Sequence, residues 1–242
     1  MKFKDKVVII TGAGQGLGAA FARAFAKEGA KVVIMGRTQS KLDEIAISIE
    51  KCGGIVMAYK ADVSEYSEVE GCIAAVIEKF GKVDILINNA AVHKSLPITE
   101  TTPEIWEQQI KINLTGTFYC SKAVLPSMIE RKYGKIINIS SSAAKVCFPG
   151  FGAYAASKGG VVSFTKTLSE EVKQDNINVN AIYLGMTDTE HSRERFDSDK
   201  AITIPLDSMM HVDDVSKVVL FLASDDASTI MGAAIDVYGK KS

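Results

Sequence analysis

Short apolar runs rich in valine and isoleucine alternate with longer amphipathic segments along the whole chain, and no other feature restricts the possible folds as much. Runs that are apolar at every position are typical of strands buried on both faces, which occur in parallel sheets covered by helices. The expected strands are 6–10, 31–35, 55–59, 83–87, 135–139, 177–182 and 234–237, and the expected helices are 16–28, 41–51, 64–80, 103–131, 154–173 and 212–223.

This alternation predicts an α/β protein of the Rossmann type. Right-handed β-α-β crossovers would give a doubly wound parallel sheet of about seven strands, with helices on both faces. No proline-rich or glycine/serine-rich linker interrupts the 242 residues, so a single domain over 1–242 is expected. The least patterned segment is 184–207, and two hypotheses for it stay open: a surface loop, or a mobile lid over a substrate pocket.

Charge and composition argue against several classes of function. The 28 basic and 29 acidic side chains leave a net charge of −1, which disfavours a broad electrostatic surface for nucleic acid or an anionic membrane. No apolar run approaches the roughly 20 residues that span a bilayer, and no secretory signal is expected. The four cysteines lack C-x-x-C spacing, which favours a reduced, cytoplasmic setting. The histidines His93, His191 and His211 lack metal-ligand spacing, so no metal site is expected.

A glycine-rich turn follows the first expected strand and opens the first expected helix. Glycine permits a tight turn and close approach of the backbone to a ligand, and a helix N-terminus suits a pyrophosphate. The alternative is a tight strand-to-helix turn with no ligand. The position of the turn within a β-α-β unit favours dinucleotide binding by Gly12, Gly14, Gln15, Gly16, Leu17 and Gly18.

The end of the second expected strand bears on the choice between NAD and NADP. NAD-binding folds usually place an acidic residue there to hold the ribose 2′-hydroxyl. This chain has Arg37 instead, and the next carboxylate is Asp43, within the following helix. A guanidinium can pair with a 2′-phosphate, so the sequence favours NADP, with NAD as the alternative. Arg37 could also be a solvated loop charge.

Tyr154 and Lys158 stand four residues apart in an expected helix and therefore share one face. A free tyrosine titrates near pH ~10, so an acid–base role at neutral pH needs a group that stabilises the phenolate. The lysine ammonium would supply that positive charge. Such a pair also arises by chance, so its spacing alone does not establish catalysis.

Taken together, the motifs resemble those of the short-chain dehydrogenase/reductase family over essentially the whole chain. The cofactor turn, Tyr154 and Lys158 all match, and Ser141 precedes the tyrosine by the usual spacing. Asn113 falls on the active-site asparagine of the family. The remaining matches are Asp62 and Val63 after the third strand, Asn88, Asn89 and Ala90 after the fourth, and Gly185, Thr187 and Thr189 after the sixth.

The resemblance implies a role for each matching residue. Tyr154 would exchange a proton with the substrate oxygen, and Ser141 would hydrogen-bond that oxygen. Lys158 would lower the pKa of the tyrosine and bond the nicotinamide ribose, while Asn113 would anchor a water that links Lys158 to solvent. Asp62 and Val63 would contact adenine, Asn89 and Ala90 would line the cofactor, and the stretch from Gly185 to Thr189 would contact its nicotinamide end.

Three positions depart from the family pattern. Ala91 replaces the glycine that usually ends the Asn-Asn-Ala-Gly stretch, and Leu184 replaces the proline that usually precedes Gly185. Without the proline the loop after the sixth strand should be freer. The end of the chain, 238–242, lacks the usual paired glycines, in a stretch that often contributes to subunit contacts.

The sequence therefore predicts an NADP(H)-dependent oxidoreductase acting on a carbonyl and its secondary alcohol. The resemblance favours a 3-oxoacyl thioester reductase, and the alternatives are a sugar, polyol or other small-alcohol dehydrogenase and a non-catalytic dinucleotide sensor. Phe148, Phe151 and Met186 suggest a partly apolar substrate, although they could equally belong to core or interface packing. The helices around Phe118–Met128 and Tyr154–Leu168 pair subunits in many family members, so a homotetramer is expected.

Overall fold

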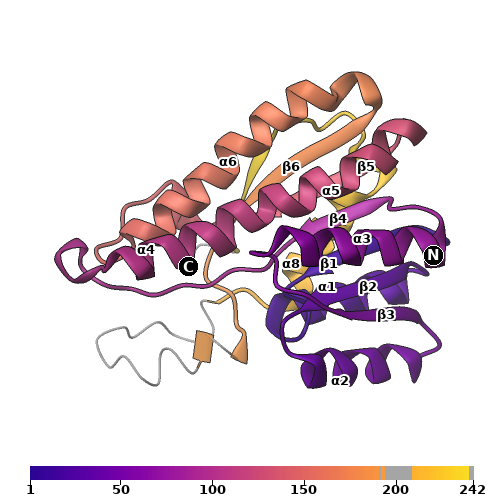
Figure 1. The fold of residues 1–242 in the computed structure, drawn as a ribbon, viewed down its shortest axis with the longest axis horizontal. Coiled ribbons are helices and arrows are strands. Elements are labelled where there is room, and N and C mark those ends of the chain that lie inside the picture. The colour runs from indigo at the N-terminus through magenta and orange to yellow at the C-terminus, as the bar shows by residue number, and fades with distance from the viewer. Residues whose placement is uncertain (191, 194–208, 240–242) are drawn as a thin grey trace.

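A computed structural model describes residues 1–190, 192–193 and 209–239 of the chain (Figure 1). Strands and helices alternate from the first strand to the last. The strands are β1 (Val7–Thr11), β2 (Lys31–Gly36), β3 (Ile55–Lys60), β4 (Ile85–Asn88), β5 (Gly134–Ile139), β6 (Ile177–Leu184) and β7 (Ala234–Val237). The main helices are α1 (Gly16–Lys27), α2 (Gln39–Glu50), α3 (Tyr66–Phe80), α4 (Pro103–Ile110), α5 (Gly116–Arg131), α6 (Gly152–Val172) and α8 (Val212–Ala223).

The seven strands form one parallel sheet in the order β3-β2-β1-β4-β5-β6-β7. The chain moves outward from β1 to β3, returns to β4 beside β1, and then moves outward in the other direction. This reversal confirms the doubly wound α/β fold that the sequence predicts. It also places the ends of β1 and β4 at the point where ligands bind in open sheets of this kind.

Helices cover both faces of the sheet (Figure 1), and an apolar core lies on each face. Helices α1, α2 and α8 pack on one face, where Phe21, Phe25 and Leu42 are fully buried. Helices α3, α5 and α6 pack on the other, against alternate side chains of the same strands. Because both faces are covered, β1 is buried at every position, which is why its sequence shows no polar alternation.

The expected helix 103–131 is divided in the structure. Helix α4 ends at Ile110, a π-helical turn spans Lys111–Thr115, and α5 begins at Gly116. A π-turn inserts a residue into the helical ladder, and such turns are frequent at functional sites. The apolar spacing is continuous across the turn, so periodicity alone does not reveal it. The turn contains Asn113, one of the predicted catalytic residues.

A buried carboxylate ties together the amino ends of the central strands. Asp84 accepts hydrogen bonds of 2.8 Å from the backbone N–H of Val7 and from Nη1 of Arg131, and its other ion-pair partner is Lys82 at 2.8 Å. Burial alone would raise the pKa of Asp84, but the contacts from Lys82, Val7 and Arg131 together hold the pKa below its ordinary value. The ionised carboxylate is therefore stabilised in the folded protein.

Replacing Asp84 by asparagine should lower the free energy of unfolding by about 2 kcal/mol at pH 7, because two half-buried cations lose their common partner. The melting temperature should fall by roughly 4–8 °C. A carboxyl whose pKa is lower in the folded state stabilises the fold above the ordinary pKa of about 4, and this contribution disappears as the pH falls through the folded pKa. Thermal unfolding followed from pH 7 downward should show the two proteins converging in acid. Asp226→Asn, at an exposed ion pair, is the control and should change little.

Most of the predicted lid 184–207 lies outside the described residues, as does His191. Its first residues are described and are held in place. The Gly185 N–H donates to the carbonyl of Val237 at 2.9 Å, and Thr187 pairs with Met210. This part of the loop is thus anchored by backbone hydrogen bonds despite the missing proline. Within the described part of the chain, no helix is both long and apolar enough to cross a membrane.

Candidate active site

Two adjacent cavities lie at the carboxyl ends of the parallel strands. Each has a volume of about 500 Å³. One contains the glycine-rich turn and the end of β2, and the other contains Ser141, Tyr154 and Lys158. Leu17, Asn89, Ala91 and Thr189 line both, so the two cavities form a continuous cleft. The cleft runs past the ends of β1 and β4, where the topology of the sheet predicts a ligand site.

The glycine-rich turn has the backbone geometry of a close-fitting cradle. Gly12 and Gly16 have positive φ values of 65° and 53°, which side-chain-bearing residues rarely adopt. A Cβ at Gly18 would lie 2.3 Å from the Gly12 carbonyl oxygen, so Gly18 serves the packing of α1 against the turn. The first turn of α1 has no acidic residue, and Gln15 makes no side-chain cap. The helix therefore presents unoccupied N–H groups and its positive dipole end to the cleft.

Hydrogen bonds from the end of β4 fix the turn in place. The Thr11 hydroxyl accepts from the N–H groups of Asn89 and Ala90, both at 3.0 Å. Asn89 Nδ2 donates to the carbonyl oxygens of Thr11 and Gly12, at 2.9 and 3.3 Å. These contacts satisfy the polar groups of the turn without using the N–H groups that start α1. The cradle is thus rigid before any ligand binds.

The cavity at the end of β2 is lined by two cations. Arg37 lies beside Asp62, with 3.9 Å between Nη1 and Oδ2, and its side chain is 57% exposed. Lys41, in the first turn of α2, bonds the side-chain oxygen of Gln15. Both line this cavity, as does Thr38. The described lining of this cavity contains these two cations and one carboxylate, Asp62, so this end of the cleft presents net positive charge to a phosphate.

The second cavity brings Ser141, Tyr154 and Lys158 together. Ser141 follows β5, and the other two residues lie on one face of α6. The Ser141 Oγ accepts from the Ala143 N–H at 3.2 Å, which leaves the hydroxyl proton available for a substrate oxygen. His93 packs edge-on against the Tyr154 ring, with 4.4 Å between ring centroids.

Lys158 is 3% exposed and is held by the end of β5. Its Nζ donates to the carbonyl of Ile139 at 2.7 Å and lies 5.9 Å from the centroid of the Tyr154 ring. Burial lowers the pKa of Lys158 to about 8. The amine therefore remains mostly charged at neutral pH but holds its proton less tightly than an exposed lysine.

The side chain of Asn113 forms hydrogen bonds within the protein. Its side chain accepts from the Val92 N–H at 2.8 Å and donates to the Val92 carbonyl at 2.9 Å. It also donates to the Ser157 Oγ at 3.0 Å, and Ser157 in turn donates to the Tyr154 carbonyl at 2.7 Å. Asn113 lines neither cavity among the described residues. The π-turn is therefore bonded directly to the helix that carries the tyrosine.

Ser157→Ala should lower kcat about tenfold. The change leaves one Asn113 donor without its buried acceptor and removes the hydroxyl bond to the Tyr154 carbonyl, so the tyrosine is held less firmly. Binding of the dinucleotide, measured by fluorescence, should be unchanged. The matched control is Ser163→Ala, on the exposed face of the same helix. A loss of thermal stability with full kcat would show that Ser157 only supports the fold.

Most of the residues predicted for the cofactor lie along the cleft. Gly12, Gly14, Gln15, Gly16, Arg37, Asp62, Val63 and Ala90 line the first cavity, Tyr154, Lys158, Gly185 and Thr187 line the second, and Leu17, Asn89 and Thr189 line both. Gly18 lies behind the turn, where it permits close packing. The predicted contact of Gly18 with the cofactor stays a prediction.

The unusual alanine at position 91 fits its place in the cleft. Ala91 does not have a positive φ, so the backbone there does not require glycine.

Lys41 and Ser157 contribute to the site but were not among the residues predicted from the sequence. The position of Lys41, four residues after Arg37, could have indicated its role, because the first turn of the helix after β2 lies near the end of that strand. No signal in a single sequence reveals the hydroxyl bridge of Ser157.

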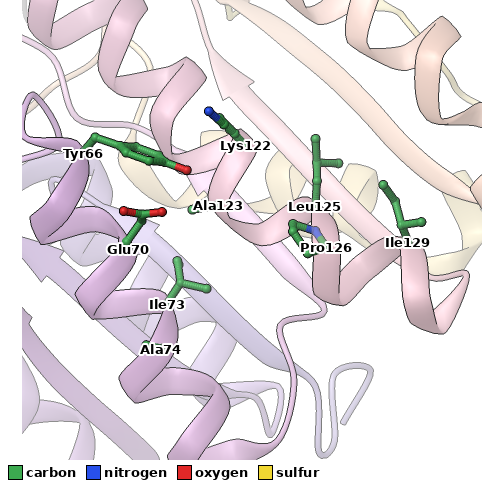
Figure 2. A pocket seen from close by; sticks show the side chains of 9 residues that line it. All are labelled: Tyr66, Glu70, Ile73, Ala74, Lys122, Ala123, Leu125, Pro126 and Ile129. Atoms are coloured by element: carbon green, nitrogen blue, oxygen red, sulfur yellow. The ribbon is translucent and has the colours of Figure 1, made fainter.

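A further cavity of about 520 Å³ lies away from these residues, between α3 and α5 (Figure 2). Tyr66 and Glu70 from α3 lie opposite Lys122 from α5, and Ile129 lies further along α5. It contains none of the residues predicted for catalysis or cofactor binding. The candidate active site is therefore the cleft at the strand ends.

The cleft fits a nicotinamide dinucleotide. A Cβ at Gly12 would lie 2.8 Å from the Ala90 Cα, so glycine is needed for the turn to pack this closely on the segment that follows β4. The open N-terminus of α1 suits a pyrophosphate, and the catalytic group lies at the other end of the cleft. The described residues hold no cluster of three or more potential metal ligands.

Comparison with known proteins places this geometry in a family. The family model described as short chain dehydrogenase matches residues 6–200. The chain is 35% identical to a 3-oxoacyl-(acyl-carrier-protein) reductase of Thermotoga maritima, and the alignment covers 99% of this chain and 98% of that protein.

Two solved structures share the fold over nearly their whole lengths. A variant of actinorhodin polyketide ketoreductase determined with NADPH has a TM-score of 0.91 and 31% identity, covering 97% of this chain and 96% of the other. Xylitol dehydrogenase bound to NAD⁺ has a TM-score of 0.92 and 29% identity, covering 99% of this chain and 100% of the other. Relatives with either cofactor therefore share this architecture.

Proposed function

Because the chain belongs to the short-chain dehydrogenase/reductase family and is an NAD(P)-dependent oxidoreductase, we propose that it uses NADP(H) to reduce a ketone with an apolar substituent. The observation that carries this proposal is the placement of Ser141, Tyr154 and Lys158 in a cavity continuous with the glycine cradle. A hydride donor and a proton donor can then reach the same carbonyl.

The proposed mechanism assigns one task to each side chain. The bound dinucleotide supplies the hydride chemistry. Ser141 donates a hydrogen bond to the carbonyl oxygen and holds it, and Tyr154 gives that oxygen a proton as negative charge develops. Lys158 stabilises the phenolate that remains and helps restore its proton. In the direction of alcohol oxidation the same groups act in reverse.

Two cations support the choice of NADP(H). Arg37 and Lys41 line the cleft at the end of β2, where an acidic residue would favour the ribose hydroxyls of NAD. A 2′-phosphate at this point would receive charge-assisted hydrogen bonds from both. Thr38 adds a hydroxyl to the same lining.

A 3-oxoacyl thioester is the substrate we favour. The relative from Thermotoga maritima is a 3-oxoacyl-(acyl-carrier-protein) reductase, and the described cavity around Tyr154 is mainly apolar. The second candidate is the oxidation of a polyol or other small alcohol. It is supported by the similarity to xylitol dehydrogenase. A non-catalytic dinucleotide sensor is less well supported, because Ser141, Tyr154 and Lys158 all face one cavity.

A substrate screen tests the proposal directly. Purified protein is mixed with 3-oxoacyl thioesters, simple ketones or polyols, and the absorbance of NADPH and NADH is followed in parallel. We expect NADPH-dependent reduction of at least one ketone or thioester, with NADH much less effective. Tight binding of NADPH without turnover of any compound would instead favour the sensor.

A homotetramer is proposed as the working assembly. Phe118, Lys122, Leu125 and Ile129 follow one another at helical spacing on α5, and the first and last of these are exposed apolar residues. Figure 2 shows Leu125 and Ile129 on the α5 side of the cavity between α3 and α5. Exposed apolar surface of this kind commonly marks a contact between protein molecules.

Light scattering should give about four times the chain mass of 26.0 kDa. Phe118→Asp should lower the assembly mass, because a carboxylate would be buried at the contact. A monomeric mass for the unmodified chain would contradict the assembly.

We place the protein in the cytoplasm, in keeping with four cysteines that are all free.

A further inference from the structure

Beside the catalytic tyrosine, aromatic rings form a continuous wall that the proposed mechanism does not use. We propose that this wall, made of His93, Phe148 and Phe151, is a specificity-determining subsite for a bulky hydrocarbon group on the reacting carbonyl. The inference rests on the proposed function and deepens it by naming the part of the substrate that the enzyme selects. A subsite of this kind favours a ketone or thioester with a hydrocarbon group over a polyol.

The rings lead from the catalytic hydroxyl towards solvent. His93 contacts both Tyr154 and Phe151, with centroid separations of 4.4 and 4.5 Å. Phe151 in turn lies 5.4 Å from Phe148 and 6.2 Å from Tyr154. These separations are those of favourable edge and tilted aromatic contacts, so the rings support one another.

The outer end of the wall is exposed. Phe148 is 44% exposed, and Met186 on the loop after β6 is 41% exposed, and both line the same cavity. Apolar side chains left in water at the mouth of a catalytic cavity gain free energy when a hydrocarbon group covers them. A small or fully hydroxylated substrate would leave them in water.

Most of the hydroxyl groups that line this cavity already have partners. Ser140 donates to the Lys158 carbonyl at 2.9 Å, and Thr187 donates to the Gly185 carbonyl at 3.2 Å. The hydroxyls of Thr189 and Ser192 bond each other at 2.8 Å. A polyol carries a hydroxyl on each carbon, and most of these four lining hydroxyls already give their proton to an acceptor within the protein. Burying such groups without hydrogen bonds is costly.

Charge leads to the same class of substrate. Among the described residues that line the cavity, Lys158 alone carries an amine or guanidinium, and none carries a carboxylate; the imidazole of His93 packs against the rings of Tyr154 and Phe151. Lys158 is buried and donates to Ile139, so it is not placed to hold a substrate acid at the mouth. The group that contacts the wall should therefore be uncharged, and it would share a cavity of about 500 Å³ with the nicotinamide end of the cofactor.

The test compares substrates that differ in this group, using the full-length protein and NADPH. The ketones are 1-tetralone, which carries a rigid ring, 3-oxodecanoyl thioester, which carries an acyl chain, and 2-butanone, which carries neither. Xylitol oxidation is measured with NADP⁺. We expect kcat/KM for the tetralone or the decanoyl thioester to exceed that for 2-butanone at least tenfold. The better of these two identifies a ring or a chain as the natural group.

Phe148→Ala tests the wall itself. It should lower kcat/KM about tenfold for the bulky ketone while changing 2-butanone less than twofold, because only the bulky group reaches the outer ring. Phe221→Ala removes an exposed phenylalanine from α8, away from the cleft, and should change neither.

Three outcomes would overturn the inference. The first is a preference for xylitol, and the second is an equal loss for all ketones in Phe148→Ala; both leave the oxidoreductase function standing. The third is NADPH binding without turnover of any compound, which would overturn the proposed function and the inference with it.

Discussion

Tyr154→Phe should lower kcat for carbonyl reduction by a factor of about a thousand, within the range that general acid–base catalysis contributes. The substitution removes one hydroxyl and leaves the ring that packs against His93 and Phe151. Without the proton donor, charge develops on the substrate oxygen with only the hydrogen bond from Ser141 to stabilise it. Turnover is measured from the loss of NADPH absorbance.

Two controls separate the loss of chemistry from damage to the fold. NADPH binding to Tyr154→Phe, measured by fluorescence, should remain within about twofold of the unmodified protein, since the cradle at Gly12 lies at the other end of the cleft. Tyr59→Phe removes a hydroxyl from β3, outside both cavities, and should retain full activity. Full activity in Tyr154→Phe would remove the tyrosine from the mechanism.

Arg37→Asp should reverse the cofactor preference. A charge-assisted hydrogen bond to a phosphate contributes about 1.5–3 kcal/mol, and an aspartate at this position would also repel the 2′-phosphate. We therefore expect kcat/KM for NADPH to fall about 100-fold, while the value for NADH stays the same or rises. The measurement is the steady-state rate with each cofactor at a fixed ketone concentration.

The control for Arg37→Asp must reproduce its change in net charge. Lys27→Asp makes the same change at an exposed position near the end of α1, away from the cleft, and should leave the ratio of the two cofactors unchanged. Lys41→Ala should weaken NADPH by a smaller factor than Arg37→Asp, because it removes a cation without adding a negative charge. An unchanged NADPH/NADH ratio in Arg37→Asp would refute the phosphate-binding role of this residue.

The fold could be predicted from the sequence because its main determinant is local. Each strand is buried on both sides, so its apolar run is continuous, and each covering helix repeats apolar residues at the spacing of one face. The division of the expected helix 103–131 could not be predicted, because it depends on contacts between residues distant in the sequence. The π-turn at Lys111–Thr115 is stabilised by hydrogen bonds from Asn113 to Val92 and Ser157, which are distant in the sequence.

The site divides in the same way. The glycine turn, Ser141, Tyr154 and Lys158 stand at spacings that a sequence displays. The structure shows Gly18 packed against the turn and Asn113 bonded to Val92 and Ser157, and their roles toward the cofactor and a bound water stay predictions. The contributions of Lys41 and Ser157 depend on the folded arrangement, because what matters is the neighbour that each contacts.

The most direct test of the proposed mechanism follows the hydrogen that the cofactor transfers to the ketone. The protein is given a ketone that it turns over and NADPH carrying deuterium at C4 of the nicotinamide, on one face or the other. The proposed mechanism predicts an alcohol product with one deuterium on the former carbonyl carbon, from one of the two labelled cofactors, and almost no product from Tyr154→Phe. Alcohol without deuterium from either cofactor, or equal product from Tyr154→Phe, would contradict it.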